Sequence, residues 1–325
     1  MSEKTTGPLH DLRVLVACGG RGAERDGSKL SAAAVADILQ SQVQSIEVAD
    51  IAAPDFFQRA ISCDIVFNAC HGLHGEDGAL QGAMDLLGIS YTGSRALTSA
   101  ICMDKEIFKQ LLLVAGLPTA PWRCVDGQVD VQSLAVTVSD LDGPWFVKPV
   151  AGGESFASGP ASSVSEIQAI VAGSASPEFD RFLIEPLTPG PTYTVAVWRN
   201  GTNYVDLPIL EARTDRVFYD PVAKQDPTQR SYHCPAWLDE RRSEQMVDIA
   251  HRVYEMVRAE SLIRVDFLLS DSGPIVLEAN TIPGFTRQGN LATILDRSGH
   301  DLEGFVVQEL LRVSPAGGLN DHLVA

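Results

Sequence analysis

Two short segments, residues 264–267 and 278–284, mix charged and amide side chains with apolar neighbours. Between them stands Asp271-Ser272-Gly273, a hairpin signal, so we expect two paired strands. Because alternate residues of a strand share a face, this hairpin gathers two carboxylates, one amide oxygen and one guanidinium on one side. The residues concerned are Arg264, Asp266, Glu278 and Asn280.

Carboxylate and amide oxygens are the ligands that Mg²⁺ prefers, and this ion usually keeps waters and bridges to substrate phosphates. An ordinary charged hairpin at the surface is the alternative. The apolar neighbours indicate buried strands instead, and buried charges need partners. We therefore expect a magnesium site here. The apolar neighbours are Val265, Phe267, Val276 and Leu277.

A candidate phosphate-binding segment lies earlier in the chain. Lys148 ends an apolar, strand-like run, and residues 152–155 follow as a glycine-rich loop. The lysine can reach phosphate oxygens, and backbone N–H groups of the loop can bind the same anion. Alone the signal is weak, because a lysine at a strand end is usually solvated. Lys105, after Met103-Asp104, is a weaker signal still.

The elements that position these residues start with a parallel α/β layer. The predicted strands are residues 12–17, 46–51 and 65–68, and the predicted helix is 31–39. Such alternation of strand and helix indicates a parallel sheet. Ligands of these sheets bind at the carboxyl ends of the strands, where Gly19-Gly20 and His71-Gly72 fall.

Beyond Gly93 the pattern becomes mixed. Gly116-Leu117-Pro118 is a helix-stop signal, and the tail from Ser314 onward is expected to fray. The predicted helices are residues 103–113, 164–171 and 243–257, and the predicted strands are 145–149, 182–185, 193–198, 263–269 and 274–278.

Composition restricts the classes of function. The 325 residues are 45% hydrophobic and 21% charged, as expected of a folded enzyme with two or three subdomains. A net charge of −17 disfavours nucleic-acid binding. No apolar run reaches the roughly 18–20 residues of a membrane span, and no secretory signal is recognised, so we expect a cytoplasmic protein. Six scattered cysteines without a Cys-x-x-Cys pair predict reduced thiols and no zinc site.

Taken in order, the short motifs resemble those of the D-alanine–D-alanine ligases of the ATP-grasp superfamily. The resemblance covers about residues 12–311, nearly the whole chain. The motifs that carry it are residues 71–78 (HGLHGEDG), 81–82 (QG), 91–94 (YTGS), 103–105 (MDK), 116–118 (GLP), 147–149 (VKP), 218–220 (FYD), 223–224 (AK), 264–267 (RVDF), 278–281 (EANT) and 283–286 (PGFT).

The resemblance implies an α/β fold with an α+β central part, in which two antiparallel sheets hold ATP between them. It implies an N-terminal parallel α/β substrate domain over residues 1–98 and a small central ATP-grasp subdomain over 99–185. A C-terminal domain with an antiparallel sheet, over 186–325, would carry the metal and catalytic site. It also suggests a homodimer.

The resemblance further implies roles at the nucleotide. Lys105 and Lys148 would contact the ATP phosphates, and Ser155 of the glycine-rich loop would bind the nucleotide. Glu185 and Leu187 would lie at the adenine. Two Mg²⁺ ions, or Mn²⁺ in their place, would be held by Asp266, Glu278 and Asn280.

At the reacting groups, the resemblance implies that Arg264 and the Gly284 N–H stabilise a tetrahedral oxyanion. Lys224, on a loop that closes over the site, would touch the transferred phosphoryl group. Glu24 and His71 would lie near the amino end of the first substrate. No protein nucleophile is needed, because ATP activates the carboxylate as an acyl phosphate.

Several substrate positions depart from the family pattern. Glu154 stands where a serine usually bridges the substrate and the closing loop, and Gln225 where the dipeptide-forming enzymes have tyrosine. Gly289 and Asn290 replace the Ser-Leu pair that holds the second carboxylate, and Thr192 replaces a carboxylate at the ribose. Neutral drift is one explanation. We predict a changed substrate, with an amine, amide, ureido or aminooxy group, and poor use of D-alanine.

The sequence therefore predicts an ATP-dependent carboxylate–amine ligase that acts on amino acids or their analogues and releases ADP and phosphate. Three alternatives stay open: a D-alanine–D-alanine ligase of peptidoglycan synthesis, an intramolecular ring-closing ligase in antibiotic biosynthesis, and a non-catalytic nucleotide-binding protein. Arg264 argues against the last alternative, because binding alone needs no oxyanion donor.

Overall fold

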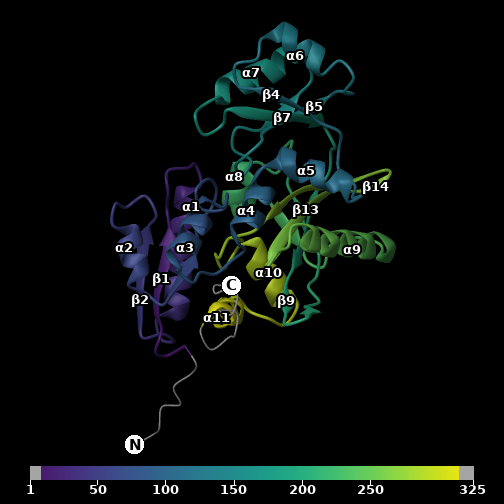
Figure 1. Ribbon diagram of the computed structural model, residues 1–325. Coiled ribbons are helices and arrows are strands. Elements are labelled where there is room, and N and C mark those ends of the chain that lie inside the picture. Colours follow the sequence, from purple (N-terminus) through teal and green to yellow (C-terminus); the bar gives the residue numbers. More distant parts are fainter. Residues whose placement is uncertain (1–8, 315–325) are drawn as a thin grey trace, which may run out of the picture.

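A computed structural model describes residues 9–314 of the chain. In this part of the chain the strands form three main groups and a separate pair of β9 (Arg199–Asn200) and β10 (Asn203–Tyr204). Figure 1 shows the parallel layer at the left, a small sheet with two helices at the top and, below it, a larger sheet beside helix α9 (Glu240–Met256). The prediction for the tail concerns residues that lie, apart from Ser314, outside the described part.

The N-terminal group is a three-stranded parallel sheet in the order β2-β1-β3. Val14 and Val16 of β1 pack against Val35 on one face, whereas Leu15 packs against Phe56 on the other. Both faces are therefore covered, as parallel sheets require. The elements are β1 (Arg13–Cys18), α1 (Arg25–Leu39), β2 (Ser45–Asp50), α2 (Phe56–Ile61), β3 (Ile65–Asn68) and α3 (Ala79–Leu87). The predicted parallel layer is confirmed.

The second group is a four-stranded antiparallel sheet in the order β4-β7-β5-β6. Two helices cover it, and Leu134 and Ile167 of these helices pack with Val147 and Ile184 of the strands. The elements are β4 (Arg123–Asp126), α6 (Val131–Thr137), β5 (Trp145–Pro149), β6 (Gly159–Ala161), α7 (Val164–Ser174) and β7 (Arg181–Pro186).

The third group is a five-stranded antiparallel sheet in the order β12-β11-β8-β13-β14. Helix α9 (Glu240–Met256) covers one face, where Val253 packs with Val195 and Val265. The predicted hairpin is confirmed, with Asp271-Ser272 as its turn. The strands are β8 (Thr192–Val197), β11 (Leu210–Arg213), β12 (Ser231–His233), β13 (Ile263–Ser270) and β14 (Gly273–Asn280).

The helix predicted over 103–113 begins differently. Met103 ends α4 (Ala96–Met103), and α5 (Lys105–Val114) starts after a break at Asp104. Asp104 has an extended backbone, and its carboxylate accepts the N–H of Ile107 at 2.9 Å as an N-cap. The break places Lys105 at the start of α5, where its own N–H donates to the carbonyl of Val150 at 2.9 Å.

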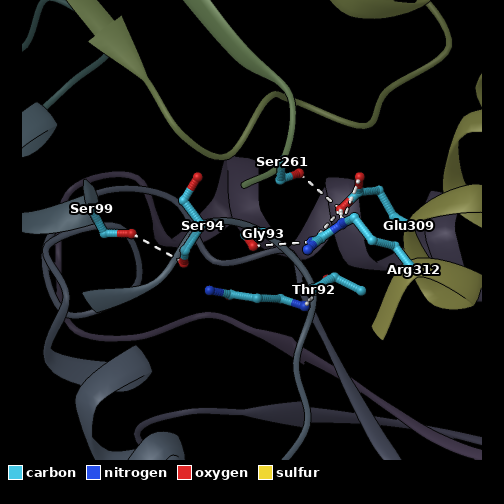
Figure 2. A network of polar contacts seen from close by, with 8 residues as sticks. Thr92, Gly93, Ser94, Ser99, Ser261, Glu309 and Arg312 are labelled. Atoms are coloured by element: carbon cyan, nitrogen blue, oxygen red, sulfur yellow. Dashed lines mark hydrogen bonds and ion pairs between the residues drawn. The ribbon is translucent and has the colours of Figure 1, made fainter. Parts of the chain in front are cut away.

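A polar network joins the parallel layer to the third group of strands (Figure 2). Arg312 of α11 (Leu302–Val313) donates Nη2 to the carbonyl of Gly93 at 3.1 Å and to Glu309 Oε2 at 2.8 Å. Ser261, just before β13, donates to the same Glu309 oxygen at 2.8 Å. The buried glutamate is thus paired and hydrogen-bonded, as a buried charge requires. The remaining elements are β9 (Arg199–Asn200), β10 (Asn203–Tyr204), α8 (Pro221–Gln225), η1 (Pro227–Gln229), α10 (Asn290–Arg297) and α11 (Leu302–Val313).

Candidate active site

A cavity of about 310 Å³ lies between the two antiparallel sheets, and loops of the parallel layer form one of its walls. Every site residue predicted from the sequence lines this cavity except Gln225. The backbone of Gln225 lies in α8, and its side chain is outside the described part of the structure. Residues far apart in the sequence therefore converge on one cavity.

The register of the β13–β14 hairpin brings the four chemical groups together. Arg264 pairs with Asn280, and Asp266 pairs with Glu278, so all four lie on the cavity face. Directly beyond Asp266 the register shifts, and Leu277 is left in a bulge. Leu277, which was expected to be buried with its neighbours, consequently lines the cavity as well.

Asp266 is held in place on both carboxylate oxygens. Thr194 donates its hydroxyl to Oδ1 at 2.6 Å, and Asn280 donates Nδ2 to Oδ2 at 3.0 Å. Burial raises the pKa of Asp266, although Arg264 lowers it in part. Because the Asn280 amide donates through nitrogen, its Oδ1 is the end left for a metal.

The donor set fits magnesium. The hairpin offers two carboxylates and one amide oxygen, all hard ligands. Within residues 9–314, no three His, Cys, Asp or Glu side chains are grouped closely enough to enclose a metal by themselves. An ion held by Asp266, Glu278 and Asn280 would therefore complete its shell with water and phosphate oxygens, which is the usual habit of Mg²⁺.

Buried lysines face acidic side chains across the cavity. Lys105 Nζ lies 3.3 Å from Glu278 Oε2 and donates to the carbonyl of Gly152 at 2.5 Å. Lys148 Nζ lies 2.7 Å from Glu185 Oε2, and Lys109 donates to Oε1 of the same glutamate at 2.5 Å. Burial alone would raise the pKa of Glu185, but the two lysines outweigh it and the pKa is lowered. The lysines predicted to contact phosphate, Lys105 and Lys148, are thus held in position by carboxylates.

The glycine-rich loop is strained. Glu154, Ser155 and Ala157 have φ of 53°, 58° and 53°, a left-handed conformation that non-glycine residues seldom adopt. Ser155 donates its hydroxyl to the carbonyl of Tyr219 at 3.1 Å. This bond joins the loop to the segment just before α8, the short helix that carries Lys224. A movement of either segment therefore affects the other.

Acidic side chains gather where the parallel layer meets this loop. A Cβ on Gly72 would lie 2.5 Å from Glu24 Oε1, and a Cβ on Gly153 would lie 2.8 Å from it. The Glu24 carboxylate therefore fits here only because both positions are glycine. Burial and the charge of Glu154 raise the pKa of Glu24 to about 7. Burial and the charge of Glu24 raise the pKa of Glu76 to about 8.

Glu76 and Ser31 accept hydrogen bonds from the loop that contains Gly284. Glu76 accepts the N–H of Gly72 at 2.8 Å and the N–H of Ile282 at 3.1 Å. Ser31 Oγ accepts the N–H of Phe285 at 3.1 Å. These two bonds flank Gly284 on both sides, so the parallel layer fixes the backbone donor predicted for the oxyanion.

His71 lies beside Ser31, one of the two residues that hold this loop. Its Nε2 is 2.8 Å from Ser31 Oγ. Burial, together with Arg264, lowers the pKa of His71 to about 4, so the ring is neutral near pH 7. A neutral imidazole positions substrate by hydrogen bonding rather than by charge.

Two family models match the chain. The model described as D-ala D-ala ligase C-terminus covers residues 111–312, and the model described as D-ala D-ala ligase N-terminus covers residues 43–94. The chain belongs to the D-alanine–D-alanine ligase family. It is thus a member of a family of ATP-dependent ligases that form a carbon–nitrogen bond, and the non-catalytic alternative is not supported.

Individual ligases agree with this assignment. The chain is 33% identical over 301 residues to the D-alanine–D-alanine ligase of Pseudoalteromonas translucida, covering 92% of this chain and 96% of the relative. It is 35% identical over 312 residues to that of Stutzerimonas stutzeri, covering 95% and 96%. The Bacillus anthracis ligase, solved in complex with ATP, superposes with a TM-score of 0.78 at 26% identity, over 94% of this chain and 97% of that one. The predicted ATP-grasp fold is confirmed.

Several residues of this ligase that line or support the cavity were given no role from the sequence. Glu76 lies inside the motif 71–78, and an acidic residue in such a glycine-rich motif could have indicated a functional role. Lys109 and Thr194 have partners 76 and 72 residues away, so spacing could not reveal them, whereas Arg230 donates to carbonyls only six and seven residues away. These residues are Lys109, Thr194, Tyr219, Arg230 and Tyr232.

Glu76→Gln should flatten the pH dependence of stability. The pKa of Glu76 is about 8 in the folded ligase, against an ordinary value of about 4.3 in the unfolded chain. Between these values the folded state holds a proton that the unfolded state releases, so the free energy of unfolding falls as pH rises from about 5 to 8. Glutamine cannot titrate, which removes this contribution.

The measurement is the urea midpoint from pH 5 to 8.5 without nucleotide or metal. The control is Glu244→Gln, which replaces an exposed glutamate on α9. Parallel pH profiles for wild type and Glu76→Gln would contradict the buried, protonated state of Glu76.

Proposed function

We propose that this ligase joins two molecules of D-alanine, using ATP and Mg²⁺ and releasing ADP and phosphate. The observation that carries the proposal is the β13–β14 register, which sets Arg264 beside the oxygen ligands and opposite the buried lysines. Relatives named as D-alanine–D-alanine ligases match nearly the full chain and support this substrate.

This substrate replaces the one predicted from the sequence. The departures at Glu154, Gln225, Gly289 and Asn290 suggested poor use of D-alanine, but the relatives support D-alanine better than an analogue. The names of these relatives give no support to a ring-closing reaction or to a place in antibiotic biosynthesis. The departures are then changes in how the same zwitterion is held.

ATP would lie between the two antiparallel sheets. Its phosphates would meet Lys105, Lys148 and the strained loop with Ser155, and its adenine would lie by Glu185 and Leu187. Magnesium bound by the hairpin oxygens would neutralise phosphate charge. Lys148 would then exchange part of its contact with Glu185 for a phosphate oxygen.

In the first step, a carboxylate oxygen of one D-alanine attacks the γ-phosphorus, and ADP leaves. Lys224, which was expected on a loop and lies on the short helix α8, would face the transferred phosphoryl group, and Glu24 would face the ammonium group of this D-alanine. The amine of the second D-alanine then attacks the acyl carbon. Arg264 and the fastened N–H of Gly284 would meet the developing oxyanion, and phosphate leaves.

Three further features stay predictions. The domain division at residues 98/99 and 185/186, the homodimer and the cytoplasmic location are proposed for this ligase on the family resemblance alone. Between residues 9 and 314, no helix combines the length and apolar character that crossing a membrane requires.

D-alanine itself tests the proposed function. We expect ADP release at millimolar D-alanine, with one D-alanyl-D-alanine formed per ADP, because the cavity holds groups for both steps. Coupled ADP release and mass spectrometry of the product measure the two quantities, with L-alanine as the control. Absence of the dipeptide at millimolar D-alanine would refute the assignment and favour a different amino-acid substrate.

Asp266→Asn and Glu278→Gln should each abolish turnover and leave the fold intact. Each change removes a negative metal ligand but keeps the shape of the side chain, so we expect a loss of at least about 10³-fold at ordinary Mg²⁺ concentrations. Asp248→Asn on the exposed side of α9 is the matched control. Near-normal ADP release by either variant would show that the metal assignment is wrong.

Arg264→Ala should lower kcat by roughly 10²–10³, the usual cost of one preorganised oxyanion donor, with a smaller effect on the KM for ATP. Arg264→Lys keeps the charge and should recover part of the rate. If the rate were unchanged and ATP binding weakened, Arg264 would belong to the nucleotide site instead.

A further inference from the structure

Within residues 9–314, one hydrogen bond joins the parallel layer to the second group of strands. Ala23, in the loop after β1, donates its N–H to Glu178 Oε1 at 2.8 Å, across 155 positions of sequence. The other side-chain hydrogen bonds that leave residues 9–94 reach residues 282–312 instead. The contact between Ala23 and Glu178 therefore fixes the position of the layer relative to the small sheet at a point that no other such bond supports.

Glu178 is carried by a tight turn between α7 and β7. Ser176 and Phe179 exchange two backbone hydrogen bonds, of 3.1 Å and 3.0 Å, and the N–H of Phe179 also donates to Ser176 Oγ. The Phe179 ring packs on the core of the second group, and a Cβ on Gly152 would lie 3.0 Å from it. The turn thus contacts the glycine-rich loop through Phe179 and the parallel layer through Glu178.

The backbone on the other side leaves room for this contact. A Cβ on Gly22 would lie 3.0 Å from Glu178 Oε1, so the absence of a side chain at residue 22 lets the carboxylate approach closely. A carboxylate that accepts a backbone N–H forms a charge-assisted hydrogen bond, which is stronger than a bond between neutral groups.

The residue that this bond positions is Glu24, which directly follows Ala23. Its carboxylate lies between Gly72 and Gly153, and the latter belongs to the glycine-rich loop. Glu24 is the N-cap residue of α1, yet its side chain makes no capping hydrogen bond, so its carboxylate remains available for a ligand in the cavity. If the bond at Ala23 were lost, the two loops could separate and Glu24 would leave this position.

Charge indicates which ligand group this edge of the cavity suits. Glu24, Glu76 and Glu154 all line it. Acidic side chains attract a cation and repel phosphate and carboxylate groups. Of the organic groups in the proposed reaction, only the ammonium group of D-alanine is cationic.

We propose that Glu178 is a positioning residue: by accepting the Ala23 N–H, it holds Glu24 against the glycine-rich loop, where Glu24 meets the ammonium group of a D-alanine. The inference rests on the proposed function, which supplies the D-alanine. Glu178 is not among the residues that line the cavity, so it acts only through the loop of Ala23 and Glu24.

Hydrogen exchange and kinetics test the two halves of this inference. In Glu178→Ala the Ala23 amide should exchange about 10-fold faster than in wild type, measured by mass spectrometry of the peptide around residue 23. Initial rates over a wide range of D-alanine give a KM for each of its two sites. One of these values should rise about 5-fold, whereas the other, kcat and the KM for ATP should change less than about 2-fold.

Two further variants separate positioning from the loss of a surface charge. Glu178→Gln keeps an acceptor oxygen at the same place, so it should restore both the protection of Ala23 and the KM to within about 2-fold of wild type. Asp180→Ala is the matched control, because it removes an exposed carboxylate two residues away, where the carbonyl rather than the side chain accepts the N–H of Gly127. It should change neither quantity.

The outcomes distinguish this inference from the proposed function. Equal exchange of Ala23 in wild type and Glu178→Ala would overturn the contact. Faster exchange with both D-alanine KM values within about 2-fold of wild type, or with equal increases in all KM values, would overturn the positioning role and leave the function standing. Absence of wild-type dipeptide synthesis would overturn the proposed function and this role toward D-alanine together.

Discussion

The structure depends on the balance of charge among the acidic and basic side chains that line one cavity. Asp266 and Glu278 share one face of the β13–β14 hairpin, and neither could be buried there without partners. Thr194 and Asn280 donate hydrogen bonds to Asp266, whereas Lys105 forms an ion pair with Glu278. The same rule couples Glu185 to two lysines. Nucleotide and metal would therefore enter a site whose charges are already placed, and binding would exchange partners rather than create them.

The parallel layer matters to the chemistry because it holds the loop after β14. Glu76 and Ser31 accept backbone N–H groups on either side of Gly284, across more than two hundred residues of sequence. The network of Glu309 and Arg312 fixes the same layer to the start of β13 (Figure 2). A donor for an oxyanion must be placed before the charge develops. The parallel layer and the β13–β14 hairpin are consequently linked by hydrogen bonds on both sides of the proposed oxyanion donor.

The sequence alone could predict what depends on local pattern. Alternation and a two-residue turn were enough for the hairpin and for the shared face of Asp266 and Glu278. Periodicity could not place the start of α5, because the cap at Asp104 interrupts a continuous apolar pattern. The hydrogen bonds of Glu76 to Ile282 and of Tyr232 to Asn290 could not be predicted, because the partners are distant in sequence. The substrate predicted from Gly289 and Asn290 is not supported by the relatives. The motif positions alone could not show that Tyr232 donates to Asn290 or that Thr286 lies against Gly289.

The central claim is that this cavity activates the carboxylate of D-alanine as an acyl phosphate. The most direct test supplies D-alanine labelled with ¹⁸O in its carboxylate, together with ATP and Mg²⁺, and analyses the released phosphate by mass spectrometry. Attack of a carboxylate oxygen on the γ-phosphorus predicts one ¹⁸O atom in each phosphate released with dipeptide. Dipeptide accompanied by unlabelled phosphate would contradict the account.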